Sequence, residues 1–346
     1  MPSMQNTRIL MITTHPFWGD PLGNGSLVRS RYRVLSEIFE KVFVLYLSED
    51  GQKNPLNGGT LHYNGVITSE VLASINKIIS EYHINACYFS YIQTETLANN
   101  LPTFNIVEIH DVLHLRSDQF AAYGFSPPIE ITKELELKLL KSFDLVLCIN
   151  IDEAGYLTEC GIENVKWLPP SENFNAHRLE QKNSAIATAG FVGSCAAPNI
   201  DGIAQIRALI QKLDSFIMAG PISKDVEVVA KLPDGVQKLG VINDLSNFYK
   251  QVSVTVSPIR FGAGLKIKVF ESLANGIGVL ATEHSIQGFP DGIRDVAVVD
   301  PFPEAWSVGL VEQAERINKE RIRSYFEEHF SHQKVITTLQ ALIPRF

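Results

Sequence analysis

The chain has 346 residues, of which 45% are hydrophobic and 20% charged, as in an ordinary globular protein. That length predicts about two domains. The formal net charge of −8 argues against a nucleic-acid ligand and against a broadly basic membrane-docking face. Because no apolar run approaches the roughly 18–20 residues of a membrane span and the polar start differs from a secretion signal, we expect a cytoplasmic protein. At most we expect weak peripheral contact with the cytoplasmic face of a membrane; the oligomeric state stays open.

Four cysteines are scattered along the chain, and none forms a Cys-x-x-Cys pair. Cys87, Cys148 and Cys195 lie in or beside apolar, strand-like runs. This placement predicts buried free thiols rather than disulfides or metal ligands.

Strand-like and helical patterns alternate along the first half of the chain, which predicts a parallel sheet with crossover helices. The expected strands are 8–14, 42–47, 86–89, 105–109, 145–149 and 165–168. The expected helices are 26–39, 69–81, 129–142 and 152–159. Asp152 is the expected N-cap of the last helix, and Gly161 its C-terminal stop.

A polar, turn-rich linker is expected over 171–184, and a second alternation follows it. The expected strands there are 185–192, 216–219, 236–239, 252–257, 277–281 and 296–299. The expected helices are 201–213, 244–249, 267–275 and a long C-terminal pair over 304–342. Open parallel sheets bind ligands at the carboxyl ends of their strands, so we expect a cleft between the two domains.

Arg29, Arg31 and Arg33 form a local basic cluster in the acidic first half. On a helix these positions spread around more than one face, so the simplest expectation is a solvated surface.

The most informative stretch is 254–276, where a β-branched strand leads into a Gly-rich turn and then a helix. Such a turn presents backbone N–H groups at a helix N-terminus, where the helix dipole favours an anion. Arg260, Lys266 and Lys268 add positive charge beside it, and Glu271 follows about one helical turn later. Diphosphate at one end and a ribose diol at the other would describe a nucleotide-sugar site.

This stretch does not match the motifs of two better-known phosphate-binding loops. Lys266 is not followed by Ser or Thr, as a Walker A loop requires, and Ile267 stands where a dinucleotide fingerprint needs its third glycine. A purely structural interpretation also remains, because Lys268 and Glu271 are spaced as an ordinary helix ion pair, worth roughly 0.2–0.5 kcal/mol.

The whole run Ser-Pro-Ile-Arg-Phe-Gly-Ala-Gly-Leu-Lys-Ile-Lys-Val-Phe-Glu-Ser-Leu-Ala-Asn-Gly over 257–276 resembles the donor-site motif of the retaining family 4 glycosyltransferases, the glycosyl transferases group 1. Three more segments resemble that family: 191–202, the first strand and turn of its second domain; 239–245, the loop holding the nucleobase; and 285–289, a later turn. The resemblance covers nearly all of the second half.

The first half is similar to the family more loosely. Gly23-Asn24-Gly25-Ser26, with Arg29 following, resembles the Gly-rich loop that closes over the donor phosphates. His110 follows a strand, where members place a histidine that hydrogen-bonds the donor sugar; the alternative is a core or surface histidine held by Asp111. His15 and His114 are weaker candidates.

The resemblance implies an α/β protein of the GT-B fold, with two Rossmann-like, doubly wound parallel-sheet domains facing a central cleft. The implied domains are an acceptor-binding domain over 1–170, the linker 171–184 and a nucleotide-sugar donor domain over 185–330. A C-terminal helix at about 331–346 is implied to cross back to the first domain.

The resemblance also implies the roles of individual residues. Glu271 would bind ribose, and Val241 and Ile242 would pack on the base. Catalysis is assigned to His110, Lys266 and Glu271, and acceptor binding to His15 and Arg29. The other donor-binding residues, which hold the diphosphate through cations and turn amides or close over it, are Arg260, Gly262, Gly264, Leu265, Lys266, Ile267, Lys268, Gly25 and Ser26.

Two departures from the family pattern matter. Ala263 stands where many members carry an acidic residue eight positions before the ribose-binding glutamate. Ser194 and the turn 198–202 stand where many carry an Arg and a Lys, so the diphosphate charge falls on Arg260, Lys266 and Lys268.

The expected function is a retaining hexosyl transfer from a nucleotide-diphosphate sugar, such as a UDP- or GDP-sugar, to a hydroxyl of a glycan, glycolipid or glycoprotein, as in bacterial surface polysaccharide synthesis. We expect no cofactor, and no metal because an Asp-x-Asp motif is lacking. Two alternatives stay open: a non-catalytic or partner-subunit homologue that binds a nucleotide sugar, and a GT-B sugar-nucleotide epimerase.

Overall fold

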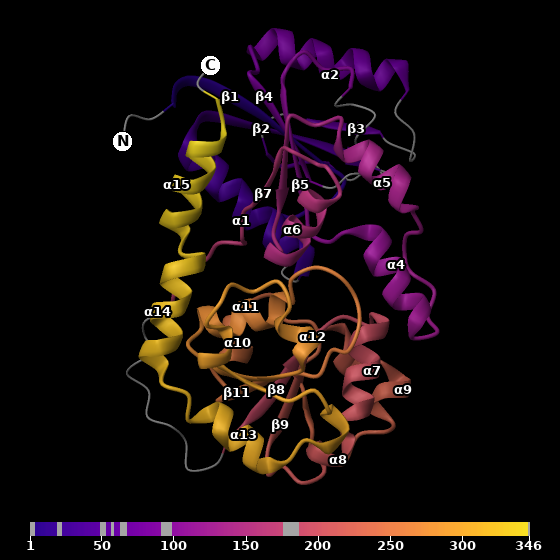
Figure 1. Ribbon diagram of the computed structural model, residues 1–346, viewed down its shortest axis with the longest axis vertical. Coiled ribbons are helices and arrows are strands. Elements are labelled where there is room, and N and C mark those ends of the chain that lie inside the picture. The colour runs from indigo at the N-terminus through magenta and orange to yellow at the C-terminus, as the bar shows by residue number, and fades with distance from the viewer. Residues whose placement is uncertain are drawn as a thin grey trace. The chain divides into compact units, whose positions relative to one another are not determined.

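The computed structural model describes residues 4–18, 23–48, 53–56, 59–62, 68–90, 99–175 and 187–344. The chain forms two compact units (Figure 1). Unit 1 comprises Met1–His114, Ile129–Ser171 and His332–Phe346, and unit 2 comprises Leu115–Pro128 and Glu172–Ser331. Most of the expected linker, 176–184, lies outside the described residues.

Unit 1 is built on a parallel sheet with the strand order β3-β2-β1-β4-β5-β6-β7. Its strands are β1 (Met4–Thr13), β2 (Phe39–Ser48), β3 (Thr60–His62), β4 (Ala86–Ser90), β5 (Phe104–Ile109), β6 (Leu145–Cys148) and β7 (Val165–Trp167). Its helices are α1 (Gly23–Ile38), α2 (Ser69–Tyr82), α5 (Lys133–Leu140), α6 (Ile151–Glu159) and α15 (His332–Leu342). One further helix, α4 (Leu113–Ala122), begins in unit 1 and continues into unit 2.

The C-terminal helix α15 completes the core of unit 1. It lies beside α1 although some 300 residues separate them in the chain (Figure 1). Three of its apolar side chains, Val335, Ile336 and Leu339, and that of Ile343 just after it are buried in one cluster with side chains of β1, α1 and β2. The end of the chain therefore belongs to the hydrophobic core of its beginning.

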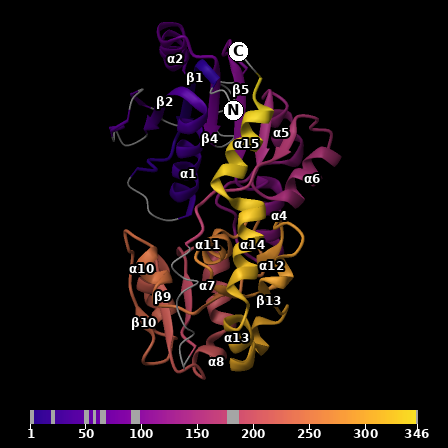
Figure 2. The same ribbon diagram turned by 90° about the vertical axis from the view of Figure 1, so that its left-hand side faces the viewer.

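Unit 2 has a six-stranded parallel sheet in the order β10-β9-β8-β11-β12-β13, with β10 and β13 at its two edges (Figure 2). Its strands are β8 (Ala189–Val192), β9 (Phe216–Ala219), β10 (Gln237–Lys238), β11 (Val254–Ser257), β12 (Gly278–Ala281) and β13 (Ala297–Val299). The α-helices are α7 (Ala197–Gln205), α8 (Arg207–Ile210), α9 (Val226–Val229), α10 (Ser246–Tyr249), α11 (Ile267–Ala274), α12 (Glu283–Ile286), α13 (Val308–Glu315) and α14 (Lys319–Phe330). Short 3-10 turns are η3 (Pro221–Lys224), η4 (Ile293–Asp295) and η5 (Pro303–Ala305).

The two parallel α/β sheets confirm the expected fold class. In each sheet the chain proceeds outward in one direction and then returns to extend the sheet from its centre. The direction reverses between β1 and β4 in unit 1, and between β8 and β11 in unit 2. Such switch points leave a crevice at the carboxyl ends of the two strands, where open α/β sheets bind ligands.

Several local expectations are wrong. The N-cap of α6 is Asn150, not Asp152, because the Asn150 side chain accepts hydrogen bonds from the N–H groups of Asp152 and Glu153. The expected C-terminal helix pair is three helices, α13, α14 and α15, because α13 ends at Glu315 and Asn318 caps a new start. The expected helix 201–213 begins earlier and divides at Ile206 into α7 and α8.

Other elements, β3, α4 and several short helices, were not expected from the residue pattern. Cys87 and Cys148 are buried as expected, and burial raises the pKa of the Cys87 thiol to about 12. Cys195 is exposed, contrary to expectation, because it follows β8 in a surface turn. Within the described residues, the structure contains no helix long and apolar enough to span a membrane.

Candidate functional site

The glycine-rich turn lies at the switch point of unit 2, between β11 and α11. Gly262 and Gly264 have φ values of +104° and +73°, a region that side-chain-bearing residues rarely adopt. They let the chain turn sharply from the buried strand into the helix. Among the described side chains none caps the start of α11, whose N-cap position is Lys266. The first N–H groups of α11 are therefore not occupied by a capping side chain.

Lys268 joins this turn to the turn after β8. Its Nζ donates to Asn199 Oδ1 on α7 at 2.5 Å and lies 4.0 Å from the ring centroid of Phe191 on β8. Burial, with the positive charge of Lys266 adding to it, lowers the pKa of Lys268 to about 7. A cation that is partly desolvated beside a ring and a neutral amide is stabilised by an added anion.

Glu271 lies about one turn further along α11. It accepts a hydrogen bond of 3.0 Å from the hydroxyl of Tyr249, at the end of α10. Burial raises the pKa of Glu271 to about 7, while the Tyr249 hydrogen bond and the Lys268 charge oppose that shift. The carboxylate is thus held by a neutral donor and keeps acceptor capacity for a further hydroxyl.

Lys266 has a different environment from Lys268, two residues away. Its Nζ donates to three carbonyl oxygens of its own turn: Gly264 at 2.9 Å, and Gly262 and Ala263 at 3.2 Å. In this conformation the Lys266 ammonium group neutralises the backbone dipoles of the turn.

Arg260, the third cation of the motif, is held in an ion pair. Its Nε and Nη2 donate to the two oxygens of Asp201 on α7 at 2.9 and 2.7 Å. Its guanidinium carbon also lies 5.3 Å from the ring centroid of Tyr123. The three cations that the sequence groups together therefore have three separate sets of contacts.

The expected base-binding loop follows β10. Val241 is exposed and Ile242 is half-buried. The loop is tied to β9 and η3 because the Gly240 carbonyl accepts from Gly220 N–H at 2.8 Å and Ser223 Oγ accepts from Gly240 N–H at 3.0 Å. An exposed valine on an anchored loop presents an apolar surface of the kind that packs on a planar base.

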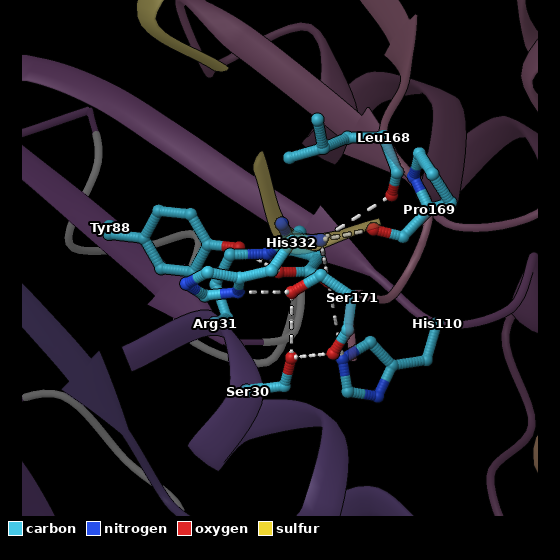
Figure 3. Close-up of polar contacts among 9 residues, drawn as sticks. Ser30, Arg31, Tyr88, His110, Leu168, Pro169, Ser171 and His332 are labelled. Carbon is cyan, nitrogen blue, oxygen red and sulfur yellow. Dashed lines mark hydrogen bonds and ion pairs between the residues drawn. The ribbon is translucent and has the colours of Figure 1, made fainter. Parts of the chain in front are cut away.

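In unit 1, His110 follows β5 and is buried in a polar network (Figure 3). Its Nε2 lies 3.9 Å from Glu108 Oε1, and Glu108 also accepts from the Tyr88 hydroxyl. Burial lowers the pKa of His110, although the Glu108 and Asp111 carboxylates oppose the shift. His110 is therefore a neutral imidazole near neutral pH, and it is buried rather than exposed on the surface.

We expected Arg29, Arg31 and Arg33 to lie on a solvated surface, and for Arg31 this expectation is wrong. Its side chain is buried and donates to both oxygens of Glu108 and to the carbonyls of Leu168 and Pro169 (Figure 3). On α1, only one of the three positions faces the sheet, and there Arg31 meets the buried carboxylate.

The remaining expected residues of unit 1 lie on β1, α1 and their connection. His15 is in a turn after β1, where its N–H donates to Thr13 Oγ1 at 3.0 Å. Gly25 and Ser26 lie in the first turn of α1 rather than in an open loop, and Arg29 follows on the same helix, half-buried.

Two residues beside the expected donor motif, Gln119 and His284, were not predicted from the sequence. Gln119 Oε1 accepts from Gly262 N–H at 2.8 Å, and His284 Nε2 lies 2.6 Å from the Gly262 carbonyl oxygen. Neither has a sequence signal, since one lies 143 residues before Gly262 and the other 22 after it. For Glu108 the sequence does carry a signal, because a glutamate within an apolar strand requires a buried partner.

Over the described ranges, no group of three His, Cys, Asp or Glu side chains is arranged to hold a metal ion.

Comparison with known proteins adds independent observations. The family model of glycosyl transferases group 1 matches residues 187–313. Among solved structures, sucrose-phosphate synthase from Thermosynechococcus elongatus is 15% identical, with a TM-score of 0.74 over 97% of this chain and 98% of that one. A glycosyltransferase from Rickettsia africae is 12% identical, with a TM-score of 0.68 over 98% of each chain.

HepE from Anabaena, in complex with UDP and glucose, is 11% identical, with a TM-score of 0.68 over 97% of this chain and 99% of that one. A sequence comparison with curated proteins returns no match. The structural matches extend over both units, and the family match coincides with the sheet of unit 2. The chain has the GT-B fold, and its residues 187–313 match the family model of the glycosyl transferases group 1.

Proposed function

We propose that the protein is a glycosyltransferase that moves a hexosyl group from a nucleotide-diphosphate sugar to a hydroxyl acceptor. The observation that carries this proposal is the setting of Lys268: a partly desolvated ammonium, hydrogen-bonded to a neutral amide, between α7 and α11 at the β8/β11 switch point. A diphosphate would place negative charge beside the Lys268 ammonium, whose hydrogen-bond partner is otherwise a neutral amide.

The rest of the donor fits around that anion. First-turn N–H groups of α11 would share the phosphate oxygens with Lys268, and Glu271 would accept hydrogen bonds from the ribose diol. Val241 and Ile242 would pack on the base. HepE has been solved in complex with UDP and with UDP-glucose, which supports a uridine nucleotide as the first donor to test.

Glycosyl transfer builds negative charge on the departing diphosphate. Preorganised cations and helix N-terminal amides stabilise such charge without a metal ion. We therefore propose metal-independent transfer, and retention of the anomeric configuration as the family resemblance implies. In unit 1 we propose that His110 contacts substrate, and that acceptor binding involves His15 and Arg29.

The first experiment measures nucleotide binding by calorimetry and thermal shift with UDP, GDP and ADP. A ligand at 100 times its dissociation constant adds about 2.7 kcal/mol to the free energy of unfolding, so the cognate nucleotide should stand out. Lys268→Met should abolish most of that shift, whereas Lys250→Met, at an exposed position of the same unit, should keep it. If none of the three nucleotides binds the parent protein, the proposal is wrong.

The second experiment distinguishes the activities. Incubation with the matching nucleotide sugar should release free nucleotide slowly, even without acceptor, and Glu271→Ala should lower that rate. Addition of EDTA should leave the rate unchanged, and NMR of a transferred product should show the donor's anomeric configuration. Nucleotide binding without turnover would favour a binding-only homologue, for which Ala263 in place of the common acid argues. A changed sugar on an intact nucleotide would favour an epimerase.

A further inference from the structure

Both backbone hydrogen-bonding groups of Gly262 are held by side chains. Its N–H donates to Gln119 Oε1 at 2.8 Å. Its carbonyl oxygen lies 2.6 Å from His284 Nε2 and also accepts from Lys266 Nζ at 3.2 Å. Gln119 and His284 come from elements far apart in sequence, so a single glycine of the donor turn is fixed from two sides.

Gln119 belongs to Leu115–Pro128, the part of the first half of the chain that groups with unit 2. Aromatic stacking explains this grouping. The ring of Phe261 is fully buried and stacks on Tyr123 and Phe125, with centroid separations of 4.5 and 5.2 Å, while Phe120 meets it edge-on at 5.3 Å. These rings hold α4 against the residue that precedes Gly262, so the Gln119 side chain is anchored.

His284 can bond Gly262 in only one way. A carbonyl oxygen accepts hydrogen bonds, so His284 Nε2 must carry the proton and donate it. Burial and the nearby Lys266 charge lower the pKa of His284 to about 4, so the imidazole is neutral across the physiological range. Its hydrogen bond to the turn is therefore independent of pH across this range.

Gly262 controls the direction of the turn that follows it. Its φ is +104°, and a glycine whose backbone groups were not held could adopt many other conformations as easily. Holding its N–H and its carbonyl fixes the peptide planes on both sides, and with them the path through Gly264 to the first turn of α11. A turn fixed before its ligand arrives loses less conformational entropy on binding.

We propose that Gln119 and His284 are positioning residues that preorganise the turn from Gly262 to Ile267 for the diphosphate of the donor. They act through Gly262 and touch no substrate. The inference rests on the proposed donor site, and it adds a segment of the first half of the sequence to the machinery of unit 2.

The test compares UDP with uridine as ligands of the same variants. Gln119→Met keeps the length of the side chain and removes the acceptor, and His284→Ala removes the donor. Gln119→Met removes the side-chain acceptor of the Gly262 N–H, and His284→Ala removes the shorter of the two side-chain hydrogen bonds to its carbonyl, so UDP affinity should fall about tenfold or more. The affinity for uridine, which has no diphosphate, should change less than twofold in both variants.

Conservative rescue separates positioning from folding. The amide of glutamine reaches the place of the histidine Nε2–H, so His284→Gln should bind UDP within about threefold of the parent protein. Asp118→Ala and Gln287→Ala change exposed neighbours on or next to the same two helices and should bind UDP as the parent does. Melting temperatures of all variants identify any that fail to fold.

Each outcome has one meaning. If the parent protein binds UDP, and Gln119→Met and His284→Ala bind it equally well, the positioning role is wrong while the donor site stands. An equal loss of UDP and uridine affinity would also overturn it, because that pattern indicates general damage to unit 2. If the parent binds no UDP, GDP or ADP, the proposed function itself has failed.

Discussion

Inside unit 1, Arg31 donates from Nε to Oε2 of Glu108 at 2.7 Å and from Nη2 to Oε1 at 3.0 Å. Both side chains are almost completely buried. The same guanidinium donates to the carbonyls of Leu168 and Pro169, which follow directly after β7. The pair thus joins α1, β5 and the last strand of the sheet at the edge where His110 lies.

Removing one partner of this pair should destabilise the protein strongly. Arg31→Met leaves the Glu108 carboxylate buried beside a thioether, and the expected loss is about 3–5 kcal/mol in the free energy of unfolding. The double variant Arg31→Met, Glu108→Leu removes both charges and should lose much less than the sum of the single variants. Urea titration measures all three, with the exposed Arg33→Met as a control that should unfold like the parent. Equal midpoints for Arg31→Met and Arg33→Met would refute the role of the pair.

Nucleoside diphosphate binding should pass through a maximum near neutral pH. Lys268 has a pKa of about 7, so its ammonium loses its proton as the pH rises above 7, and affinity for the diphosphate falls. Glu271 also has a pKa of about 7, so it becomes protonated as the pH falls below 7; one of its oxygens then carries a donor hydrogen and the carboxyl accepts less strongly from a ribose diol. Calorimetry with UDP from about pH 5.5 to about pH 9 measures both limbs.

The two limbs should separate by mutation. Lys268→Met should remove the alkaline decline, and Glu271→Gln the acid decline. Any acid slope that persists in Glu271→Gln belongs to titration of the ligand's own phosphate. An unchanged alkaline decline in Lys268→Met would show that another group binds the diphosphate.

The sequence predicts the sheets well because a buried parallel strand needs a local run of apolar residues. Expected strand 216–219 coincides with β9, and expected helix 267–275 nearly coincides with α11. The turn between strand and helix could also be predicted from the sequence, since only glycine readily tolerates the φ values at Gly262 and Gly264. Each of these features is determined by a few neighbouring residues.

What the sequence could not predict depends on partners far along the chain. Arg31 and Arg33 look alike in the sequence, but only Arg31 meets Glu108, 77 residues away. Lys266 and Lys268 likewise differ through their partners: one bonds its own turn and the other reaches Asn199 on α7. The resemblance predicts a donor motif in this stretch, and tertiary contacts give each of its three cations a separate environment.

The missed helix α4 shows the same dependence and leads to a third prediction. Glu136 is fully buried, and its carboxylate accepts from the N–H groups of Leu113 and His114, at the start of α4, and from His114 Nδ1. Glu136→Gln places an amide donor among donors, so the free energy of unfolding should fall by about 1–3 kcal/mol. Hydrogen exchange should quicken at the first amides of α4.

Glu134 provides the matched control for that change, because it lies on the same helix with its side chain exposed. Glu134→Gln should leave both the urea midpoint and the exchange rates of α4 as they are in the parent. If Glu136→Gln matched Glu134→Gln in both measurements, the cap would contribute nothing to stability.

Two Gly→Ala substitutions test how tightly unit 2 is packed: one at a crowded position of unit 2, the other, as a control, at an open position of unit 1. Gly278 begins β12, and a Cβ added there would collide with the carbonyl oxygen of Ala314 on α13. Its φ is not positive, so the expected effect is steric alone: Gly278→Ala must push α13 away from the sheet and should cost about 1–3 kcal/mol. Gly155 lies exposed in α6 with open space around an added Cβ, and Gly155→Ala should stabilise the protein by about 0.5–1 kcal/mol. The melting temperature should therefore fall for Gly278→Ala and rise for Gly155→Ala. A Gly278→Ala variant as stable as the parent would mean that α13 can shift without cost.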